Sequence, residues 1–296
     1  MNVLIITGGN SSERTVSLRS AKEVQKALLE NGHKVKFYDL KKGYEGILKV
    51  SVDFDVLFPV LHGEEGEGGK LHKFLSQIKK PIVGTRNYKN LDIAWHKITF
   101  KKYCRKFGIK TASWKQVNNN FDILSFGFPC VLKTIDGGSS KEVVILKDKS
   151  DLNKFAFRKI MRLKSKKFVE RYLSGIEITV GVLNGKALPV IEIVPTKGTW
   201  FNFENKYDGS TQEIPFAPSL SKEKQKNVQE IALKIHRDFD LGIYSRSDFI
   251  ISDDIIYALE VNTIPGLTAQ SLMPKAALAA GISFNEFLEI LLKTAK

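Results

Sequence analysis

Four polar side chains stand at the outer ends of two apolar runs in the stretch RSDFIISDDIIYALEVNTIPG, residues 246–266. Arg246 and Asp248 belong to the first run, and Glu260 and Asn262 to the second, with a polar turn between them. Side chains alternate faces along a strand, so residues of like parity share a face. With residue 253 at the turn centre, we expect residue 248 opposite 258 and residue 246 opposite 260. This register gathers the four polar groups at one end of one face.

Two carboxylates that converge in a half-apolar site repel each other, and their desolvation is costly unless a cation compensates. Oxygen ligands from Asp, Glu and Asn suit Mg²⁺, which typically combines one or two carboxylates with waters and substrate phosphates. An exposed edge hairpin with a surface ion pair would produce the same pattern. This stretch alone leaves both interpretations open.

A second polar loop, KTIDGGSSKE (residues 133–142), lies between two expected strands. Its glycines and backbone N–H groups could cover a phosphate, with Lys133 adding positive charge. It lacks the Gly-Lys-Ser/Thr of a Walker A motif, and GGNSSER near the N-terminus is not a dinucleotide fingerprint. A plain hairpin turn explains the loop equally well.

The N-terminal third alternates strands and helices, which predicts a doubly wound α/β layer with a parallel sheet. Residues 3–6, 34–40 and 55–63 read as strands, and 15–32 as an amphipathic helix closed by Gly32. A glycine-rich loop, GEEGEGG, and a helix over 70–78 follow.

The pattern changes near residue 92. We expect one helix over 93–108, two strands around the glycine loop within 128–146, a helix over 151–162 and a strand over 166–173. A third segment predicts a hairpin with its turn at Asn184-Gly185, an irregular loop over 195–218, a helix over 221–239, the opening hairpin and a closing helix. The expected domains are therefore 1–92, 93–173 and 174–296.

Composition bounds the class of protein. The chain has 296 residues and a net charge of +14, carried by scattered lysine runs that are typical of solvated helix faces. The charge alone could indicate an anionic ligand or a nucleic acid. No aromatic-basic platform, zinc finger or RNP-like motif supports RNA binding, so we expect no nucleic-acid partner. No apolar run approaches a membrane span, and MNVLIITGGN reads as a first strand and not a signal peptide. Cys104 and Cys130 have no metal spacing, which favours a reducing cytoplasm.

The order of the motifs is more specific than any one of them. GGNSSERTVSL, LHGEEGEGG, Lys97, Lys133 with GGSS, VERYLSGIEITV, NKY and RSD…EVNTIPGLTAQSL span nearly the whole chain. In this order the sequence resembles the D-alanine–D-alanine ligases of the ATP-grasp superfamily. The resemblance implies an α/β (α+β) ATP-grasp fold, in which an N-terminal doubly wound parallel sheet is followed by two α+β domains that sandwich ATP.

The implied reaction joins two D-alanines with ATP through an acyl phosphate, for peptidoglycan precursor synthesis. By similarity, Asp248, Glu260 and Asn262 hold two Mg²⁺ ions, which Mn²⁺ could replace, on the ATP phosphates. Arg246 and the backbone N–H of Gly266 would stabilise the oxyanion of the tetrahedral intermediate. The family is usually homodimeric through its N-terminal segment, and we carry that expectation over.

The resemblance also implies a set of nucleotide contacts. Lys97 and Lys133 would bind phosphates. Glu170 would contact the adenine or ribose and Glu177 the ribose hydroxyls, although both could be ordinary surface carboxylates. The glycine loop would close over the phosphates through the residues Gly137, Gly138, Ser139 and Ser140.

Amino-acid recognition is expected from both ends of the chain. Glu13 would face the ammonium of the first D-alanine, with His62 in the same region, although a histidine after a buried strand is more often structural. Ser271 and the Leu272 backbone would hold the carboxylate of the second D-alanine.

Lys206 and Tyr207 match a lid in the family. Tyr207 would bond Ser139, with Glu13 in the same network, and lid closure would keep water from the acyl phosphate. The tyrosine favours a dipeptide product, because relatives that make D-alanyl-D-lactate lack it.

Five positions depart from the family pattern. Lys141-Glu142 replace the usual Val-Gly, Thr134 replaces a proline, His96 replaces an acidic or small polar residue, and Ile264 stands where serine, leucine or methionine is common. The alternatives are an ATP-grasp ligase for another D-amino acid or hydroxy acid, a nucleotide-binding homologue without turnover, and a basic RNA-binding protein, which rests on charge alone.

Overall fold

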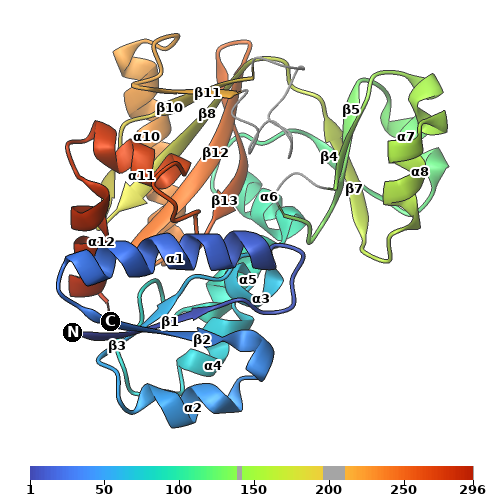
Figure 1. Cartoon of the computed structure of the whole chain (residues 1–296). Helices are drawn as coiled ribbons and strands as arrows, with labels where there is room; N and C mark the ends of the chain where they lie inside the picture. The colour runs from blue at the N-terminus through green and yellow to red at the C-terminus, as the bar shows by residue number, and fades with distance from the viewer. Residues whose placement is uncertain (139–141, 196–210, 296) are drawn as a thin grey trace.

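The computed structural model describes residues 1–138, 142–195 and 211–295, and it contains three sheets (Figure 1). Each sheet falls within one of the three predicted ranges, while the boundaries at residues 92 and 173 stay a prediction. In the described ranges, no helix is both long enough and apolar enough to cross a membrane.

The N-terminal sheet is parallel, with the strand order β2-β1-β3, as the alternating pattern predicted. Its strands are β1 (Asn2–Thr7), β2 (Lys34–Asp39) and β3 (Val56–Pro59), and its helices are α1 (Arg14–Glu30), η1 (Leu40–Lys42), α2 (Glu45–Ser51), α3 (Glu64–Glu67) and α4 (Lys70–Leu75). The predicted glycine-rich loop contains the short helix α3, so its reading as loop alone was wrong. Gly66 suits this helix because a Cβ there would lie 1.8 Å from the Leu61 carbonyl oxygen.

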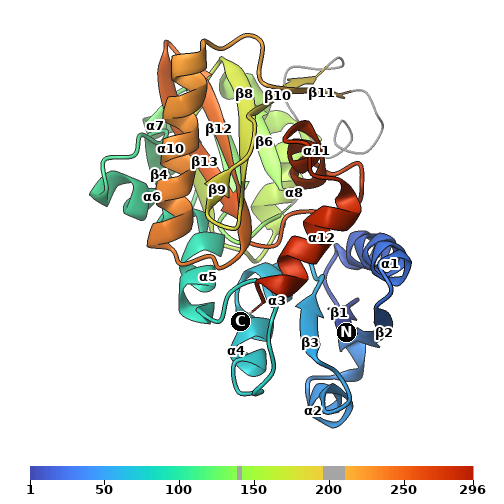
Figure 2. The same ribbon diagram turned by 90° about the vertical axis from the view of Figure 1, so that its left-hand side faces the viewer.

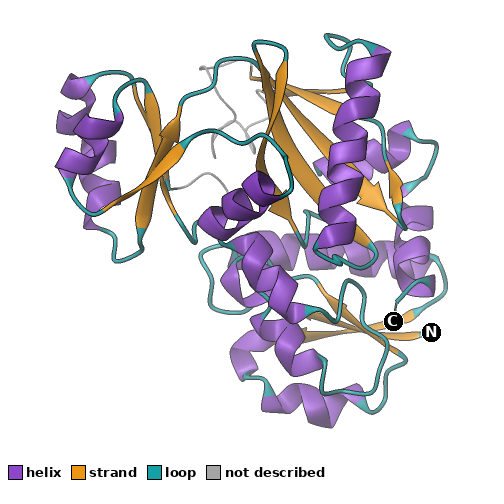
Figure 3. Ribbon diagram, turned by 180° about the vertical axis from the view of Figure 1, so that it is seen from behind, coloured by secondary structure: helices purple, strands orange, loops and turns teal. Residues whose placement is uncertain are grey.

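The second sheet is antiparallel, with the order β4-β7-β5-β6. Its elements are β4 (Trp114–Val117), α7 (Asn120–Phe126), β5 (Cys130–Thr134), β6 (Val143–Leu146), η2 (Lys149–Asn153), α8 (Phe155–Arg162) and β7 (Lys167–Arg171). Figure 3 shows the two α-helices on the outer face of this sheet, where apolar side chains form a separate small core. The opposite face of the sheet lines the cavity described below.

The third sheet is antiparallel, with the order β11-β10-β8-β12-β13, and β9 pairs with β8. Its strands are β8 (Ile176–Leu183), β9 (Lys186–Ala187), β10 (Ile191–Pro195), β11 (Thr211–Pro215), β12 (Tyr244–Ser252) and β13 (Ile255–Asn262). The predicted turn at Asn184-Gly185 is confirmed, with φ of 47° and 73°. Strand β11 lies in the predicted irregular loop, so that prediction was wrong for residues 211–215.

The helices that pack on the third sheet come from two separate parts of the sequence. Helix α10 (Lys222–Asp238) covers the sheet (Figure 2), and α5 (Tyr88–Trp95) and α6 (Lys97–Lys106) join the same core. The single helix predicted over 93–108 is therefore two helices, separated by His96 in an extended conformation.

The C-terminal helices pack between the third sheet and the N-terminal sheet. Helices α11 (Leu272–Ala279) and α12 (Phe284–Lys293) share a hydrophobic core with α1 and with strands of the N-terminal sheet. Figure 2 shows α12 beside α1. This packing brings the loop after β13 close to the loops that follow β1 and β3, which positions residues from both ends of the sequence at one site.

Candidate active site

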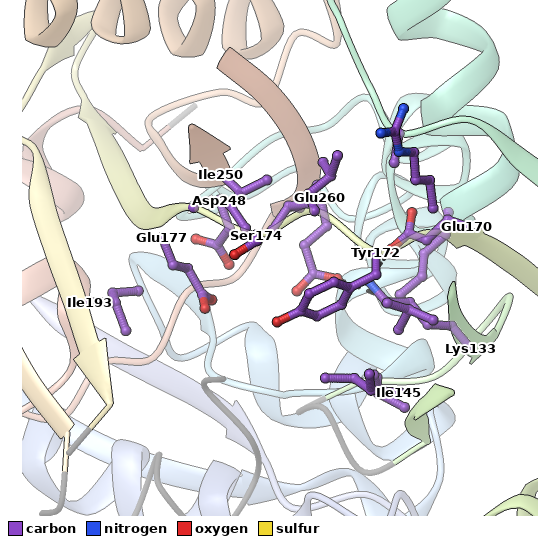
Figure 4. A pocket seen from close by; sticks show the side chains of 18 of the residues that line it. Lys133, Ile145, Glu170, Tyr172, Ser174, Glu177, Ile193, Asp248, Ile250 and Glu260 are labelled. Carbon is purple, nitrogen blue, oxygen red and sulfur yellow. Dashed lines mark ion pairs between the residues drawn. The ribbon is translucent and has the colours of Figure 1, made fainter. Parts of the chain in front are cut away.

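A cavity of about 380 Å³ lies between the second and third sheets (Figure 4). Small-molecule sites commonly have this size. Its lining combines basic groups from α6 and β5 with acidic groups from β7, β8, β12 and β13, namely Lys97, Lys133, Glu170, Glu177, Asp248 and Glu260. The two sheets thus bring together residues that are up to 163 positions apart (97 to 260).

The β12–β13 hairpin has a register different from the predicted one. Asp253 and Asp254 both have positive φ and form a two-residue turn, so Ser252 pairs with Ile255. Near the turn the pairing is therefore shifted by one residue from the prediction. A bulge at Leu259 then adds one residue to β13, and Asp248 lies opposite Glu260.

The bulge decides which side chains face the cavity. Phe249 and Ala258 pair on the core side, whereas Asp248 and Ile250 line the cavity. Leu259 and Glu260 both line the cavity, although they are consecutive. The hairpin therefore presents its two carboxylates directly opposite each other, as a pair.

The Asp248 carboxylate is held by three neighbouring side chains. Arg246 donates from Nε to Oδ1 at 2.9 Å and from Nη2 to Oδ2 at 3.0 Å. Thr179 donates to Oδ1 at 2.6 Å, and the Asn262 amide donates to Oδ2 at 3.0 Å. Burial opposes the charge of Arg246, but Asp248 and Glu260 outweigh it and raise the pKa of the guanidinium.

The oxygen atoms of these side chains are suitable ligands for Mg²⁺. Asp248 and Glu260 supply carboxylate oxygens from opposed positions, and the Asn262 side chain can turn its amide oxygen toward them. This site has two acidic side chains. Among the described residues, no group of three or more His, Cys, Asp or Glu side chains is placed to hold a metal ion.

Lys97 begins α6 at the other side of the cavity. Its Nζ contacts the Gly137 carbonyl oxygen and lies 3.9 Å from Glu260 Oε2. Its backbone N–H donates to the Ile135 carbonyl at 3.3 Å. The lysine therefore joins the glycine loop to the acidic hairpin, at the position where a phosphate would need positive charge.

Glu170 lies between two lysines. Lys133 Nζ is 2.5 Å from its Oε1, and Lys101 Nζ is 2.5 Å from its Oε2. Burial alone would raise the pKa of Glu170, but the two ammonium groups outweigh it and lower this pKa to about 2. Burial likewise opposes the Lys133 charge, while Glu170 and Glu260 raise the pKa of Lys133 overall.

Glu177 and an apolar slot occupy the remaining part of the cavity. Glu177 pairs with Ile193 on β10 and with Ile250 on β12, and Figure 4 shows its side chain near Asp248. Ile145 and Val131 approach from the second sheet, and Ile193, Ile250 and Leu259 from the third. This part of the cavity therefore has apolar side chains from both sheets.

Glu13 and His62 lie at the N-terminal side of the site. A Cβ at Gly138 would be 2.9 Å from Glu13 Oε2, and one at Gly63 would be 3.3 Å from the same oxygen. The carboxylate therefore lies against the glycine loop. His62 is 6% exposed, its Nε2 is 3.4 Å from Ser20 Oγ, and its Nδ1 is 3.7 Å from Glu67 Oε1. These contacts leave His62 in a structural position beside the site.

Gly266 and Ser271 lie together in the loop before α11. Ser271 Oγ is 2.8 Å from the position of a Cβ on Gly266, and it accepts the Thr268 N–H at 3.2 Å. Ser271 is the N-cap of α11 and Leu272 its first residue, so the helix N-terminus favours a carboxylate there.

The predicted residues Ser139, Ser140, Lys206 and Tyr207 lie outside the described residues. Their roles stay predictions.

Three residues that the sequence interpretation missed support the site. Lys101 shares Glu170 with Lys133, and Thr179 holds Asp248. Glu67 accepts the Gly63 N–H at 3.0 Å, and its carbonyl accepts the Thr263 hydroxyl at 3.2 Å, which joins the N- and C-terminal loops. Only Lys101 carries a sequence signal, because it follows Lys97 by one helical turn.

Comparison with protein families matches residues 103–293 to the family described as D-ala D-ala ligase C-terminus. The D-alanine–D-alanine ligase of Maridesulfovibrio salexigens is 36% identical over 301 residues, covering 99% of this chain and 98% of the relative. That of Aquifex aeolicus is 35% identical over 297 residues, covering 99% of this chain and 100% of the relative.

Solved structures agree with these relatives. The D-alanine–D-alanine ligase from Bacillus anthracis complexed with ATP has a TM-score of 0.84 and 31% identity, covering 99% of this chain and 97% of that one. The VanG D-Ala:D-Ser ligase from Enterococcus faecalis, at 24% identity and a TM-score of 0.81 over 99% of this chain and 98% of that one, shares the fold. With full-length relatives above 30% identity and a family match over most of the chain, this protein belongs to the D-alanine–D-alanine ligase family.

Proposed function

We propose that this protein uses ATP to join two D-alanines into D-alanyl-D-alanine, with ADP and phosphate as the other products. The observation that carries the proposal is the cavity between the second and third sheets, where Lys97 and Lys133 face the carboxylates of Asp248 and Glu260. Opposed cationic and metal-binding groups are what phosphoryl transfer to a carboxylate requires.

The lining of the cavity supports one orientation for ATP. The apolar slot between Ile145 and Ile193 would take the adenine, and Glu177 would accept from the ribose hydroxyls. The phosphates would then reach Lys97, Lys133 and Gly138. We revise the expectation for Glu170, because its carboxylate is bound by two lysines. Its proposed role is to hold Lys133 at the phosphates, and not to bind adenine or ribose directly.

Asp248, Glu260 and Asn262 would hold Mg²⁺, and Mn²⁺ has the same preference for oxygen ligands. Bound metal would neutralise the phosphates and make the γ-phosphoryl group a better acceptor for the D-alanine carboxylate. Asp248 uses Nε and Nη2 of Arg246, so we assign Nη1 to the substrate oxygen. The Gly266 N–H would be the second donor.

The two amino acids would lie between the glycine loop and the loop before α11. Glu13 would bind the ammonium of the first D-alanine, whose carboxylate takes the phosphoryl group. Ser271 and the Leu272 N–H would bind the carboxylate of the second, so that its amine can attack the acyl phosphate. Lys206 and Tyr207, with Ser139 and Ser140, would exclude water during this step.

A phosphate-release assay tests this function. We expect release with ATP, magnesium and D-alanine, and none with L-alanine. D-lactate and D-serine, each offered with D-alanine, test the second position, where mass spectrometry of the product separates a dipeptide from an ester. An absence of D-alanine-dependent phosphate release would defeat the proposal. ATP binding without turnover would support the non-catalytic alternative.

We further propose a homodimer that works in the cytoplasm, where ATP is available, with no nucleic-acid or membrane partner. Light scattering of the purified protein tests the dimer. If the protein has no nucleic-acid or membrane partner, phosphate release should be unchanged by added RNA or anionic vesicles.

A further inference from the structure

Two departures from the family pattern meet in space. Thr134 is the last residue of β5, and its hydroxyl donates to Glu142 Oε2 at 2.5 Å. The Thr134 N–H also donates to the Glu142 carbonyl, at 3.3 Å. Thr134 is 1% exposed, so its hydroxyl has little access to water. A proline at this position would provide no hydroxyl, and a glycine at position 142 would provide no carboxylate.

The bond fixes where the Glu142 carboxylate lies. Glu142 Oε2 is 2.7 Å from the position of a Cβ on Gly137, so the carboxylate is packed against the backbone of Gly137. Both Thr134 and Glu142 line the cavity together with Lys97 and Lys133. A carboxylate on this wall carries the same sign of charge as the phosphates that the two lysines would bind.

We infer that Thr134 is a positioning residue, which holds the Glu142 carboxylate against Gly137 so that it does not oppose the nucleotide phosphates. The inference rests on the proposed nucleotide site. It also explains why the chain tolerates an acidic residue in a phosphate loop, because the acid and its hydroxyl donor occur together. A charge-assisted hydrogen bond is strong enough to select one side-chain position.

The first test is nucleotide affinity, measured by calorimetry with a non-hydrolysable ATP analogue and magnesium, without D-alanine. Thr134→Val removes the hydroxyl and keeps the shape of the side chain. We expect it to weaken binding about tenfold, since one unit of like charge is released near the phosphates. Thr134→Ser keeps the hydroxyl and should bind like the wild type.

The second test separates position from packing. Glu142→Gln keeps an acceptor for Thr134 and removes the charge, so it should bind at least as tightly as the wild type. The double variant Thr134→Val/Glu142→Gln should recover the affinity that Thr134→Val loses. The weakening in Thr134→Val should also shrink at high salt, because salt screens the repulsion between charges.

Kinetics give an independent readout. In Thr134→Val the KM for ATP should rise with little change in kcat, and thermal unfolding should show that the variant folds. Unchanged affinity in Thr134→Val, or a double variant as weak as Thr134→Val, would overturn the inference. A wild-type protein that binds the analogue but releases no phosphate with D-alanine would defeat the proposed function alone. One that binds no nucleotide would defeat both.

Discussion

Lys133 and Glu170 lie on neighbouring strands, with Lys133 Nζ 2.5 Å from Glu170 Oε1. In the β5–β7 register Val131 faces Glu170 and Lys133 faces Phe168, so the two charged residues are diagonal neighbours on one face. Lys101 reaches the same carboxylate from α6 and also donates to Thr111 Oγ1 at 2.8 Å. The second sheet is thereby joined to α6 by one buried carboxylate shared between two lysines.

Glu170→Gln should destabilise the protein by about 3–5 kcal/mol, because it leaves buried ammonium groups without their counter-charge. Urea unfolding measures the loss. Since the pKa of Glu170 is lowered from 4.5 to about 2, its contribution is complete above pH 4.5 and is lost as pH falls toward 2. The difference between variant and wild type should shrink over that range. The double variant Lys101→Met/Glu170→Gln should recover part of the stability, and a wild-type unfolding curve for Glu170→Gln would contradict this role.

Glu260→Gln should lower kcat/KM by about 100-fold or more, because it removes one oxygen ligand from the proposed magnesium site. Steady-state phosphate release at several magnesium concentrations measures the effect, and a chelator should abolish wild-type activity until magnesium is restored. Asp253→Asn is the matched control, since it changes an exposed acid at the turn of the same hairpin. Equal losses in the two variants would argue against a metal site at Glu260.

The sequence predicted the three sheets better than it predicted how helices are shared between them. Alternation and turn residues depend on local geometry, so the parallel N-terminal sheet and the Asn184-Gly185 turn followed from them. The packing of α5 and α6 into the core of the third sheet depends on long-range contacts. The hydrophobic periodicity of a helix does not predict which of two neighbouring sheets the helix will cover.

The hairpin shows the same limit inside the site. Counting parity from a turn at residue 253 assumed that each residue of β12 had one partner. The two-residue turn at Asp253-Asp254 shifts the pairing by one residue, and the extra residue Leu259 shifts it by a second, which places Asp248 opposite Glu260. Glu170 is a second case, because its partner Lys101 lies 69 positions earlier and no pattern in the sequence pairs these two residues. A resemblance identifies which residues matter, whereas the register and partners decide what each one contacts.

Glu13→Gln should raise the KM for D-alanine about tenfold or more, with little change in the KM for ATP, because it removes the proposed charged partner of the substrate ammonium. Initial rates with each substrate varied separately give both constants. Glu65→Gln is the matched control. The Glu65 carboxylate accepts the Asn10 N–H at 3.3 Å in the same part of the fold, and we assign it no substrate. Equal effects of Glu13→Gln on both KM values would place Glu13 outside the D-alanine site.

We expect buried His72 to lower the free energy of unfolding as the pH falls below neutral. It is 2% exposed in α4, and burial lowers its pKa from 6.5 to about 4. Between these values the unfolded chain binds a proton that the folded chain does not, so stability is complete above pH 6.5 and falls as pH decreases toward 4. We expect a loss of about 3 kcal/mol from this residue over the range. His72→Phe should lack that part of the fall in urea unfolding, whereas other groups affect both proteins alike. Parallel pH profiles for the two proteins would show that His72 stays accessible to protons in the folded state.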